Sequence, residues 1–183
     1  DSQGDQVAGF LQPKRIAALA AGPVAPEQWG LPMRRADFYD VKADVEALLA
    51  PWLAGFERLD HPALHPGRSA SVILHGRVVG LVGELHPQWV QKYELGTAPV
   101  VFELDLDAVL QQPLPKYREV SRFPAVVRDL ALVVDQEQPA QAMLEGLIAA
   151  APALVREVVL FDVYQGKGVE PNKKSLAFRV VMQ

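Results

Sequence analysis

Two histidines stand at a spacing that could bind a metal ion. His61 and His65 are four residues apart, which on a helix would place both imidazoles on one face. Each is followed directly by a proline, Pro62 or Pro66, and proline pushes its predecessor out of the helical region. The shared face is therefore not expected to form, and the sequence predicts no metal site at these histidines.

An acidic row, Glu103, Asp105 and Asp107, could also attract a cation. The row alternates with apolar residues, so a strand with one solvated face explains it without an ion, and Asp107 is expected to cap a following turn. A metal hydrolase that combines these carboxylates with the two histidines remains an alternative. The sequence has no P-loop, no Rossmann glycine pattern and no Gly-x-Ser-x-Gly elbow, so we predict a chain without catalytic residues.

The third group of candidate residues lies near the end of the chain. Asp162 and Tyr164 are two apart in an apolar run, so on a strand they emerge side by side from one face, and Phe161 and Val163 share the other face. A tyrosine ring can stack on an unpaired base, and a carboxylate can accept hydrogen bonds from guanine N1–H and N2–H. An ordinary solvated sheet face is the alternative.

The elements that must position these residues form two groups. Before a Pro-containing segment at residues 113–118 we expect an antiparallel sheet, with strands at residues 15–21 and 100–107 and a hairpin at 71–85 that turns at Gly76. The same part should contain two helices, one over residues 41–52 with Asp40 as its N-cap and a shorter one after Pro87. The predicted domains are residues 1–112 and 119–183, joined by the linker 113–118.

Beyond the linker the expected order is strand, helix, strand, strand. The strands are predicted at Asp129–Val134, Val158–Tyr164 and Ser175–Met182, and the helix carries Met143 to Ile148 with Pro139 in its first turn. This βαββ run opens a ferredoxin-like βαββαβ unit. Alternation then predicts a sheet with an open face, to which the first and third strands contribute the following residues: Asp129, Ala131, Val133, Ser175, Ala177 and Arg179.

Composition and charge restrict the class of protein further. The 183 residues include no cysteine, which excludes disulfides and thiol chemistry and is compatible with a reducing cytosol, and no apolar run reaches the ~20 residues needed to cross a bilayer. The net charge of −4 is uneven, with −5 in residues 1–113 and +1 in residues 114–183. Four basic residues of the second part are candidates for phosphate contacts: Lys167, Lys173, Lys174 and Arg179.

Seven short motifs follow one another along the chain. They are Asp37–Lys42, His65–Ala70, Gly83–Pro87, Ser121–Pro124, Arg128–Ala131, Phe161–Gly168 and Lys174–Phe178. In this order they resemble the C-terminal part of the bacterial phenylalanyl-tRNA synthetase beta subunit family, over essentially the whole chain. Pro171-Asn172 departs from the glycine that relatives often carry after Gly168, but asparagine also tolerates a left-handed turn.

The resemblance implies an α+β fold in two parts. The first would be the back portion of a non-catalytic class II synthetase-like sheet domain that packs against a catalytic alpha subunit. The second would be a ferredoxin-fold anticodon-binding domain without its last helix and strand, so the chain is expected to be a fragment. The resemblance further implies a cytoplasmic alpha2beta2 heterotetramer, the phenylalanine tRNA as partner, and ATP and magnesium bound elsewhere in that complex.

The resemblance also implies roles for particular residues. The family's anticodon-reading positions look like Asp162, Tyr164, Ser175 and Ala131, and the phenylalanine anticodon begins with guanine. Two further hypotheses stay open. A standalone ferredoxin-like module that binds a small regulatory ligand is the alternative function. In the first domain, part of an excess of aromatic surface is expected to face the alpha subunit or other sequence, and that excess consists of Trp29, Trp52, Phe56, Trp89 and Tyr93.

Overall fold

A computed structural model describes residues 5–111 and 121–183. The chain divides into two compact units, residues 1–115 and 116–183, and each is considered by itself. The predicted linker 113–118 and the predicted boundaries at residues 112 and 119 lie outside the described residues.

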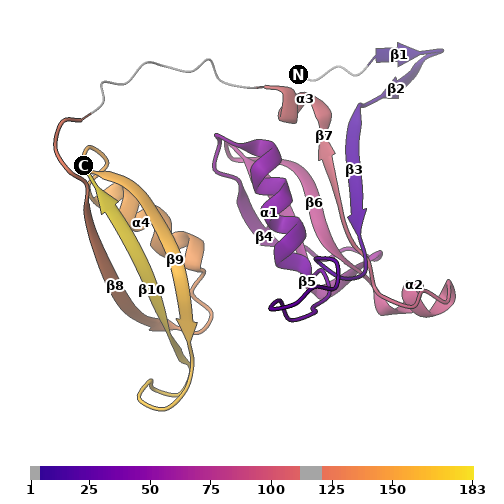
Figure 1. Ribbon diagram of the computed structural model, residues 1–183. Coiled ribbons are helices and arrows are strands. Elements are labelled where there is room, and N and C mark those ends of the chain that lie inside the picture. Colours follow the sequence, from indigo (N-terminus) through magenta and orange to yellow (C-terminus); the bar gives the residue numbers. More distant parts are fainter. Residues whose placement is uncertain (1–4, 112–120) are drawn as a thin grey trace. The chain divides into compact units, whose positions relative to one another are not determined.

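The first unit is built on an antiparallel sheet. Its elements are β1 (Asp5–Val7), β2 (Phe10–Gln12), β3 (Arg15–Ala20), α1 (Phe38–Leu49), β4 (Gly55–Arg58), β5 (Leu64–Leu74), β6 (Arg77–Leu85), α2 (Pro87–Lys92), β7 (Val100–Asp105) and α3 (Leu106–Leu110). Within the described residues, five strands form a sheet in the order β3-β7-β6-β5-β4, and β1 pairs with β2 alone (Figure 1). The expected hairpin is confirmed: β5 and β6 join through His75 and Gly76, which both have positive φ, of 51° and 74°.

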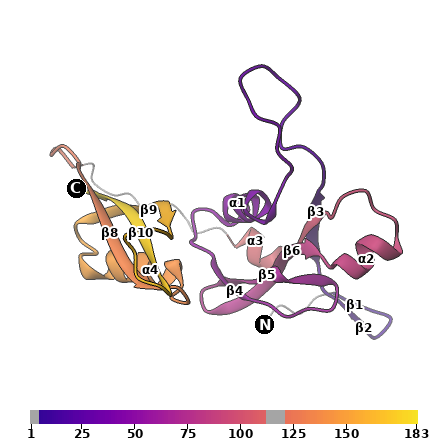
Figure 2. The same ribbon diagram turned by 90° about the horizontal axis from the view of Figure 1, so that it is seen from below.

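Helix α1 covers one face of this sheet and closes its core. Val41, Val45 and Leu49 recur at helical spacing and are at most 2% exposed. They pack on alternate residues of the central strands, including Val72 and Leu104, which are fully buried. The predicted helix is thus confirmed, and the connection from β3 to α1 extends beyond the sheet as a long loop (Figure 2).

The predicted N-cap of this helix was wrong by one turn. Asp37, not Asp40, is the N-cap, because its Oδ1 accepts the backbone N–H groups of Tyr39 at 2.8 Å and Asp40 at 3.3 Å. In turn, the Oδ2 atom of Asp40 accepts a hydrogen bond from the backbone N–H of Asp37 at 2.8 Å, which completes a capping box. The two aspartates thus fill the N-cap and N3 positions of the capping box. Asp37 is the N-cap because its backbone is extended, whereas Asp40 already lies in the helix.

The acidic strand also ends earlier than predicted. β7 stops at Asp105, whose Oδ1 accepts from the backbone N–H groups of Asp107 at 3.0 Å and Ala108 at 3.3 Å. Asp105 therefore caps α3, and Asp107 lies in the first turn of that helix instead of capping it. The alternation of inward and outward side chains holds only up to this cap.

Of the five aromatic residues expected to exceed what this unit can bury, Trp29 and Tyr93 are exposed, and the other three are partly buried. Trp52 and Phe56 pack against the core of their own unit, and Trp52 Nε1 also donates to the carbonyl of Gln111 at 3.1 Å. Trp89 stacks on Tyr93 in the predicted short helix α2, and its Nε1 donates to the carbonyl of Pro62. Trp29, in the loop before α1, is fully exposed.

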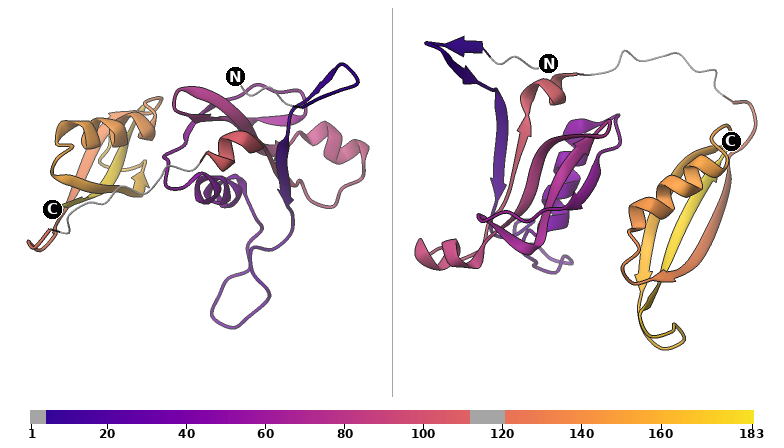
Figure 3. Two further views of the ribbon diagram at one scale, coloured as in Figure 1. Left: turned by 90° about the horizontal axis from the view of Figure 1, so that it is seen from above. Right: turned by 180° about the vertical axis from the view of Figure 1, so that it is seen from behind.

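The second unit has the predicted order of elements. They are β8 (Val126–Asp135), α4 (Ala140–Ala150), β9 (Val155–Tyr164) and β10 (Lys173–Met182). Among the described residues the sheet order is β8-β10-β9, antiparallel throughout, with α4 across one face (Figure 3). The α+β class and the βαββ run are confirmed, although Pro139 is the N-cap of α4 and not a residue of its first turn.

Alternate residues of the central strand β10 anchor this second core. Leu176, Phe178 and Val180 are 0–5% exposed and pack beneath α4 with Leu144 and Leu147. Because side chains alternate along a strand, burying these three turns Ser175, Ala177 and Arg179 to the opposite, open face. The predicted division of β10 into two faces is therefore confirmed.

Gly80 offers a test of the close approach between β6 and β7. A Cβ atom at this position would lie 2.1 Å from the carbonyl oxygen of Glu103 and 2.8 Å from Leu104 Cα, both backbone atoms of the facing strand. We expect Gly80→Ala to reduce the free energy of unfolding by about 1–3 kcal/mol, measured by urea unfolding. Gly96→Ala is the matched control, since a Cβ there meets nothing within 4 Å, and an equal loss in both variants would contradict the prediction.

The capping box of α1 predicts a dependence of stability on pH. Arg34 donates to both carboxylate oxygens of Asp40 at 2.6 Å, and this bond, with that from Asp37 N–H, lowers the pKa of Asp40 to about 2. The stabilisation should be complete above the ordinary aspartate pKa of about 4 and disappear as the pH falls towards 2. Thermal unfolding of the parent chain and Asp40→Asn should therefore converge over that range.

Asp44→Asn is the control, because it removes a carboxylate from the same helix and leaves the bond between Arg34 and Asp40 in place. A constant gap between the parent chain and Asp40→Asn from pH 5 to pH 2 would refute the assigned role of the Arg34 bond.

Candidate nucleic-acid interface

The strand register gathers all four predicted anticodon-reading residues on one face of the second unit. Ala177 of β10 pairs with Ala131 on β8 and with Asp162 on β9. The next row on the same face consists of Val133, Ser175 and Tyr164. Neighbouring strands lie about 4.8 Å apart, so the two rows form one small patch of sheet, with its carboxylate and phenol both on β9.

Asp162 is the unpaired acceptor of this patch. Its carboxylate makes no hydrogen bond or ion pair within residues 5–111 and 121–183, and the residue is exposed. Its in-row neighbours are both alanines, which leave the space above the strands free. An ionised carboxylate only accepts hydrogen bonds, so this position suits a ligand with adjacent donors.

Tyr164 is held in place by the loop that follows it. Its hydroxyl donates to the carbonyl of Lys167 at 3.2 Å, and the ring lies so close to Gly166 that a Cβ there would come within 2.9 Å of the hydroxyl oxygen. The side chain nevertheless remains 47% exposed. The ring is thus oriented by its own loop while keeping surface on which a flat ligand can stack.

A β-bulge in β9 changes the predicted face of Phe161. Asp162 pairs with Ala177 but Leu160 pairs with Phe178, so Phe161 between them has no cross-strand partner. Its ring lies against Arg179 on the open face, with the guanidinium carbon 5.1 Å from the ring centroid. The prediction that Phe161 shares a face with Val163 was therefore wrong, because strict alternation does not survive a bulge.

Arg179 is engaged by a carboxylate from the far strand. Its Nε and Nη2 donate to the two oxygens of Asp129 at 2.9 and 3.0 Å, and this bonding lowers the pKa of Asp129 and raises that of Arg179. A phosphate at Arg179 would have to compete with this bidentate pair. This competition disfavours the predicted phosphate contact, although the Arg179 side chain is 51% exposed.

The structure does not gather the three lysines into one cluster. Lys173 and Lys174 are consecutive on β10 and so point to opposite faces of the sheet. Lys173 Nζ lies 3.0 Å from a carboxylate oxygen of Glu170, which raises the lysine pKa, and Lys167 lies in the loop between β9 and β10. In this loop Asn172 adopts a φ of 67°, the left-handed turn that its residue type was expected to tolerate.

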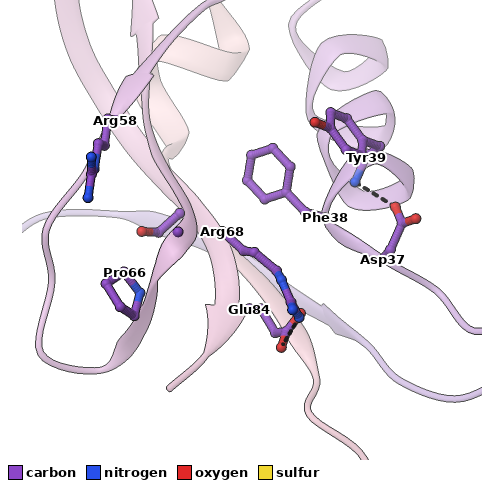
Figure 4. A pocket seen from close by; sticks show the side chains of 9 residues that line it. Asp37, Phe38, Tyr39, Arg58, Pro66, Arg68 and Glu84 are labelled. Atoms are coloured by element: carbon purple, nitrogen blue, oxygen red, sulfur yellow. Dashed lines mark hydrogen bonds and ion pairs between the residues drawn. The ribbon is translucent and has the colours of Figure 1, made fainter. Parts of the chain in front are cut away.

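A hollow in the first unit was not anticipated from the sequence. It has a volume of about 700 Å³ and lies between the start of α1 and strands β4, β5 and β6 (Figure 4). Arg68 donates to both carboxylate oxygens of Glu84 at its edge, at 2.8 and 2.6 Å, and Phe38 and Arg58 line it as well. The sequence contained a sign of this hollow, because Arg68 and Glu84 both belong to motifs noted above. Their proximity could not be predicted, since it depends on the pairing of β5 with β6.

The residues considered for metal binding are not brought together. Among the described residues no three histidine, aspartate or glutamate side chains form a group that could hold a metal ion. His61 Nδ1 accepts from Ala63 N–H and His65 Nδ1 from Gly67 N–H, in separate local turns. The carboxylate of Asp105 instead faces two arginines: its Oδ2 lies 3.6 Å from Arg77 Nη2 and 3.9 Å from Arg15 Nη1.

The helices in the described part of the chain are all too short or too polar to span a membrane.

Both units of the chain match the models of known protein domains. Residues 121–183 match the model of the ferredoxin-fold anticodon binding domain, in agreement with the βαββ sheet and its polar open face. Residues 2–106 match the model of the phenylalanyl tRNA synthetase beta chain CLM domain. The chain belongs to the phenylalanyl-tRNA synthetase beta chain family.

Similar proteins match this chain along nearly its whole length. It is 62% identical over 182 residues to the phenylalanine-tRNA ligase beta subunit of Aromatoleum aromaticum, which covers 100% of this chain and 23% of the relative. The proteins of the same name from Dechloromonas aromatica and Ralstonia nicotianae are 59% and 53% identical, over 97% and 98% of this chain and 22% and 23% of their own lengths. The chain thus spans less than a quarter of these relatives, and a standalone regulatory module is not favoured.

Proposed function

We propose that residues 121–183 bind the anticodon of the phenylalanine tRNA, as part of the beta subunit of a phenylalanine-tRNA ligase. The observation that carries the proposal is the unpaired Asp162 carboxylate beside the exposed ring of Tyr164, in a unit that matches an anticodon-binding family. Ser175 adds a hydroxyl in the same row as Tyr164, and Ala131 leaves room for a base to approach.

Asp162 would provide the selectivity and Tyr164 the affinity. Stacking on an aromatic ring contributes about 1–3 kcal/mol and tolerates every base, so Tyr164 alone cannot discriminate. Guanine presents N1–H and N2–H side by side on its Watson–Crick edge, a donor pair that adenine and the pyrimidines lack, and a carboxylate accepts both. The phenylalanine anticodon begins with guanine, which fits this acceptor.

The lysines would contribute contacts that do not depend on sequence. Lys167 lies in the loop that follows Tyr164, and Lys173 lies next to this loop on the same face of β10 as Ser175, so both would be near the backbone of a nucleic acid bound there, whereas Lys174 points to the opposite face. Such contacts would weaken as salt rises, because each one releases condensed counterions. They would not distinguish one tRNA from another.

The first unit would serve the assembly of the complex. The sheet face opposite α1 has a hollow of about 520 Å³ that Ala17, Leu81 and Val101 help to line, and Leu19 on this face is 67% exposed. Together with the fully exposed Trp29 these surfaces suit contacts with a catalytic alpha subunit in an alpha2beta2 heterotetramer. In that cytoplasmic enzyme ATP and magnesium would bind elsewhere in the complex, and the alpha subunit would attach phenylalanine to the tRNA.

Replacing Asp162 tests the proposed selectivity. In the full-length parent enzyme, Asp162→Ala should reduce discrimination for guanine at the first anticodon position by about 1–3 kcal/mol, because the acceptor of its two donors is lost. The measurement compares the affinities for tRNAs that differ only at that base. Lys173→Ala should weaken all of these tRNAs alike.

Glu157→Ala is the matched control, since this exposed carboxylate lies further along β9, opposite Val181, outside the two rows. If Asp162→Ala preserves the full preference for guanine, or Glu157→Ala removes it equally, the assignment of Asp162 is wrong.

Gly166 tests whether the orientation of Tyr164 matters for binding. A methyl group at this position would displace the Tyr164 ring, which is the movable end of a side chain, so Gly166→Ala should leave the thermal unfolding midpoint nearly unchanged. Its affinity for the tRNA should nevertheless fall several-fold, because the stacking surface moves. Gly146→Ala is the control, since a Cβ there meets nothing within 4 Å; unaltered tRNA affinity in Gly166→Ala would contradict the prediction.

A further inference from the structure

Phe161 is an aromatic side chain that its own unit does not use in the core. The bulge leaves it without a cross-strand partner, while Leu160 and Val158 on the same strand face the core. The ring is 50% exposed, although burying it would stabilise the fold by about 1.5–3 kcal/mol. The extra residue in β9 thus adds an aromatic ring to the open face without altering the inward positions on either side.

Arg179 makes this ring part of a fixed group. The guanidinium lies over Phe161 and is held by two hydrogen bonds to Asp129, so it bridges all three strands from the central one. Its side chain is still 51% exposed. Because both oxygens of Asp129 are occupied by Arg179, the group presents a flat cation and an aromatic ring without an unpaired charge of its own.

This group and Tyr164 lie on either side of Asp162 along β9. Three residues of strand span about 10 Å at most, and within the described residues the rings of Phe161 and Tyr164 make no contact with each other. Each ring therefore offers a separate stacking position. Unpaired bases stack on aromatic rings and on arginine guanidinium planes in the same way.

We propose that Phe161 and Arg179, fixed by Asp129, form a second nucleobase-stacking site on this face. The inference rests on the proposed anticodon binding and extends it: the face takes two consecutive unpaired nucleotides, one on Tyr164 beside Asp162 and its neighbour on the Phe161–Arg179 pair. Arg179 then acts by stacking and not as a phosphate ligand. The second site adds affinity with little selectivity, because stacking on an aromatic ring or a guanidinium plane tolerates every base.

The test uses the full-length parent enzyme and transcripts of the phenylalanine tRNA. One transcript is complete, and three others have an abasic nucleotide at the first anticodon position or at one of its two neighbours. Phe161→Leu should weaken binding of the complete transcript about tenfold and should have no effect on one of the two neighbour-abasic transcripts, which has no base left to stack. Tyr164→Leu should show the same pattern with the transcript that is abasic at the first position.

Three further variants separate stacking from other effects. Phe161→Trp should restore binding, whereas Arg179→Lys should weaken it like Phe161→Leu, because lysine keeps the charge but loses the planar fork. Phe123→Leu removes a 79% exposed ring of the same unit that lies outside the sheet, and its effect should not depend on any abasic position. Thermal unfolding verifies that each variant is folded.

Each result bears on the inference. If Phe161→Leu weakens all four transcripts equally, or none of them, while Tyr164→Leu behaves as expected, the second site is refuted and the proposed function stands. If Tyr164→Leu also leaves every affinity unchanged, the proposed anticodon binding fails and the second site fails with it.

Discussion

The burial of alternate residues in β10 is the constraint on which the open face depends. Leu176 and Phe178 are almost completely inaccessible beneath α4, and this fixes the register of the central strand against both of its neighbours. A slip of one residue would exchange the two faces, exposing these side chains and burying Arg179. The polar patch is therefore specified by the core on the other side of the same strand, and its geometry is as well determined as the packing of Phe178.

The first unit applies the same principle with a different outcome. Its sheet is covered by α1 on one face, where Val72 and Leu104 are buried, while the other face retains partly exposed apolar residues. In the second unit the uncovered face combines charged groups and a hydroxyl with exposed aromatic rings, which suits a ligand such as RNA. In the first it is mostly apolar, which suits protein. The difference between the two uncovered faces supports a division between assembly and tRNA binding.

The sequence predicted the features that depend on periodicity and missed those that depend on local backbone geometry. Apolar spacing located α1 and α4, and alternation correctly sorted the residues of β10. The bulge at Phe161 could not be located from the alternating pattern, because apolar residues fill positions 158–161 without a break, and only the register shows that Leu160 and Asp162, two residues apart, lie on opposite faces. The N-caps were displaced for a related reason: Asp37 and Asp40, like Asp105 and Asp107, are chemically identical candidates, and only the backbone conformation distinguishes them.

The pairing of Asp129 with Arg179 has a consequence for the history of the sequence. The two residues are separated by 50 positions, yet Arg179 Nε and Nη2 donate to both carboxylate oxygens of Asp129. A change at either one would leave the charge of the other without this partner on the open face, so we expect the two positions to be under joint selection. Across the family they should have evolved as a pair, retained together or replaced together, at a different pace from the neighbouring solvent-exposed sites.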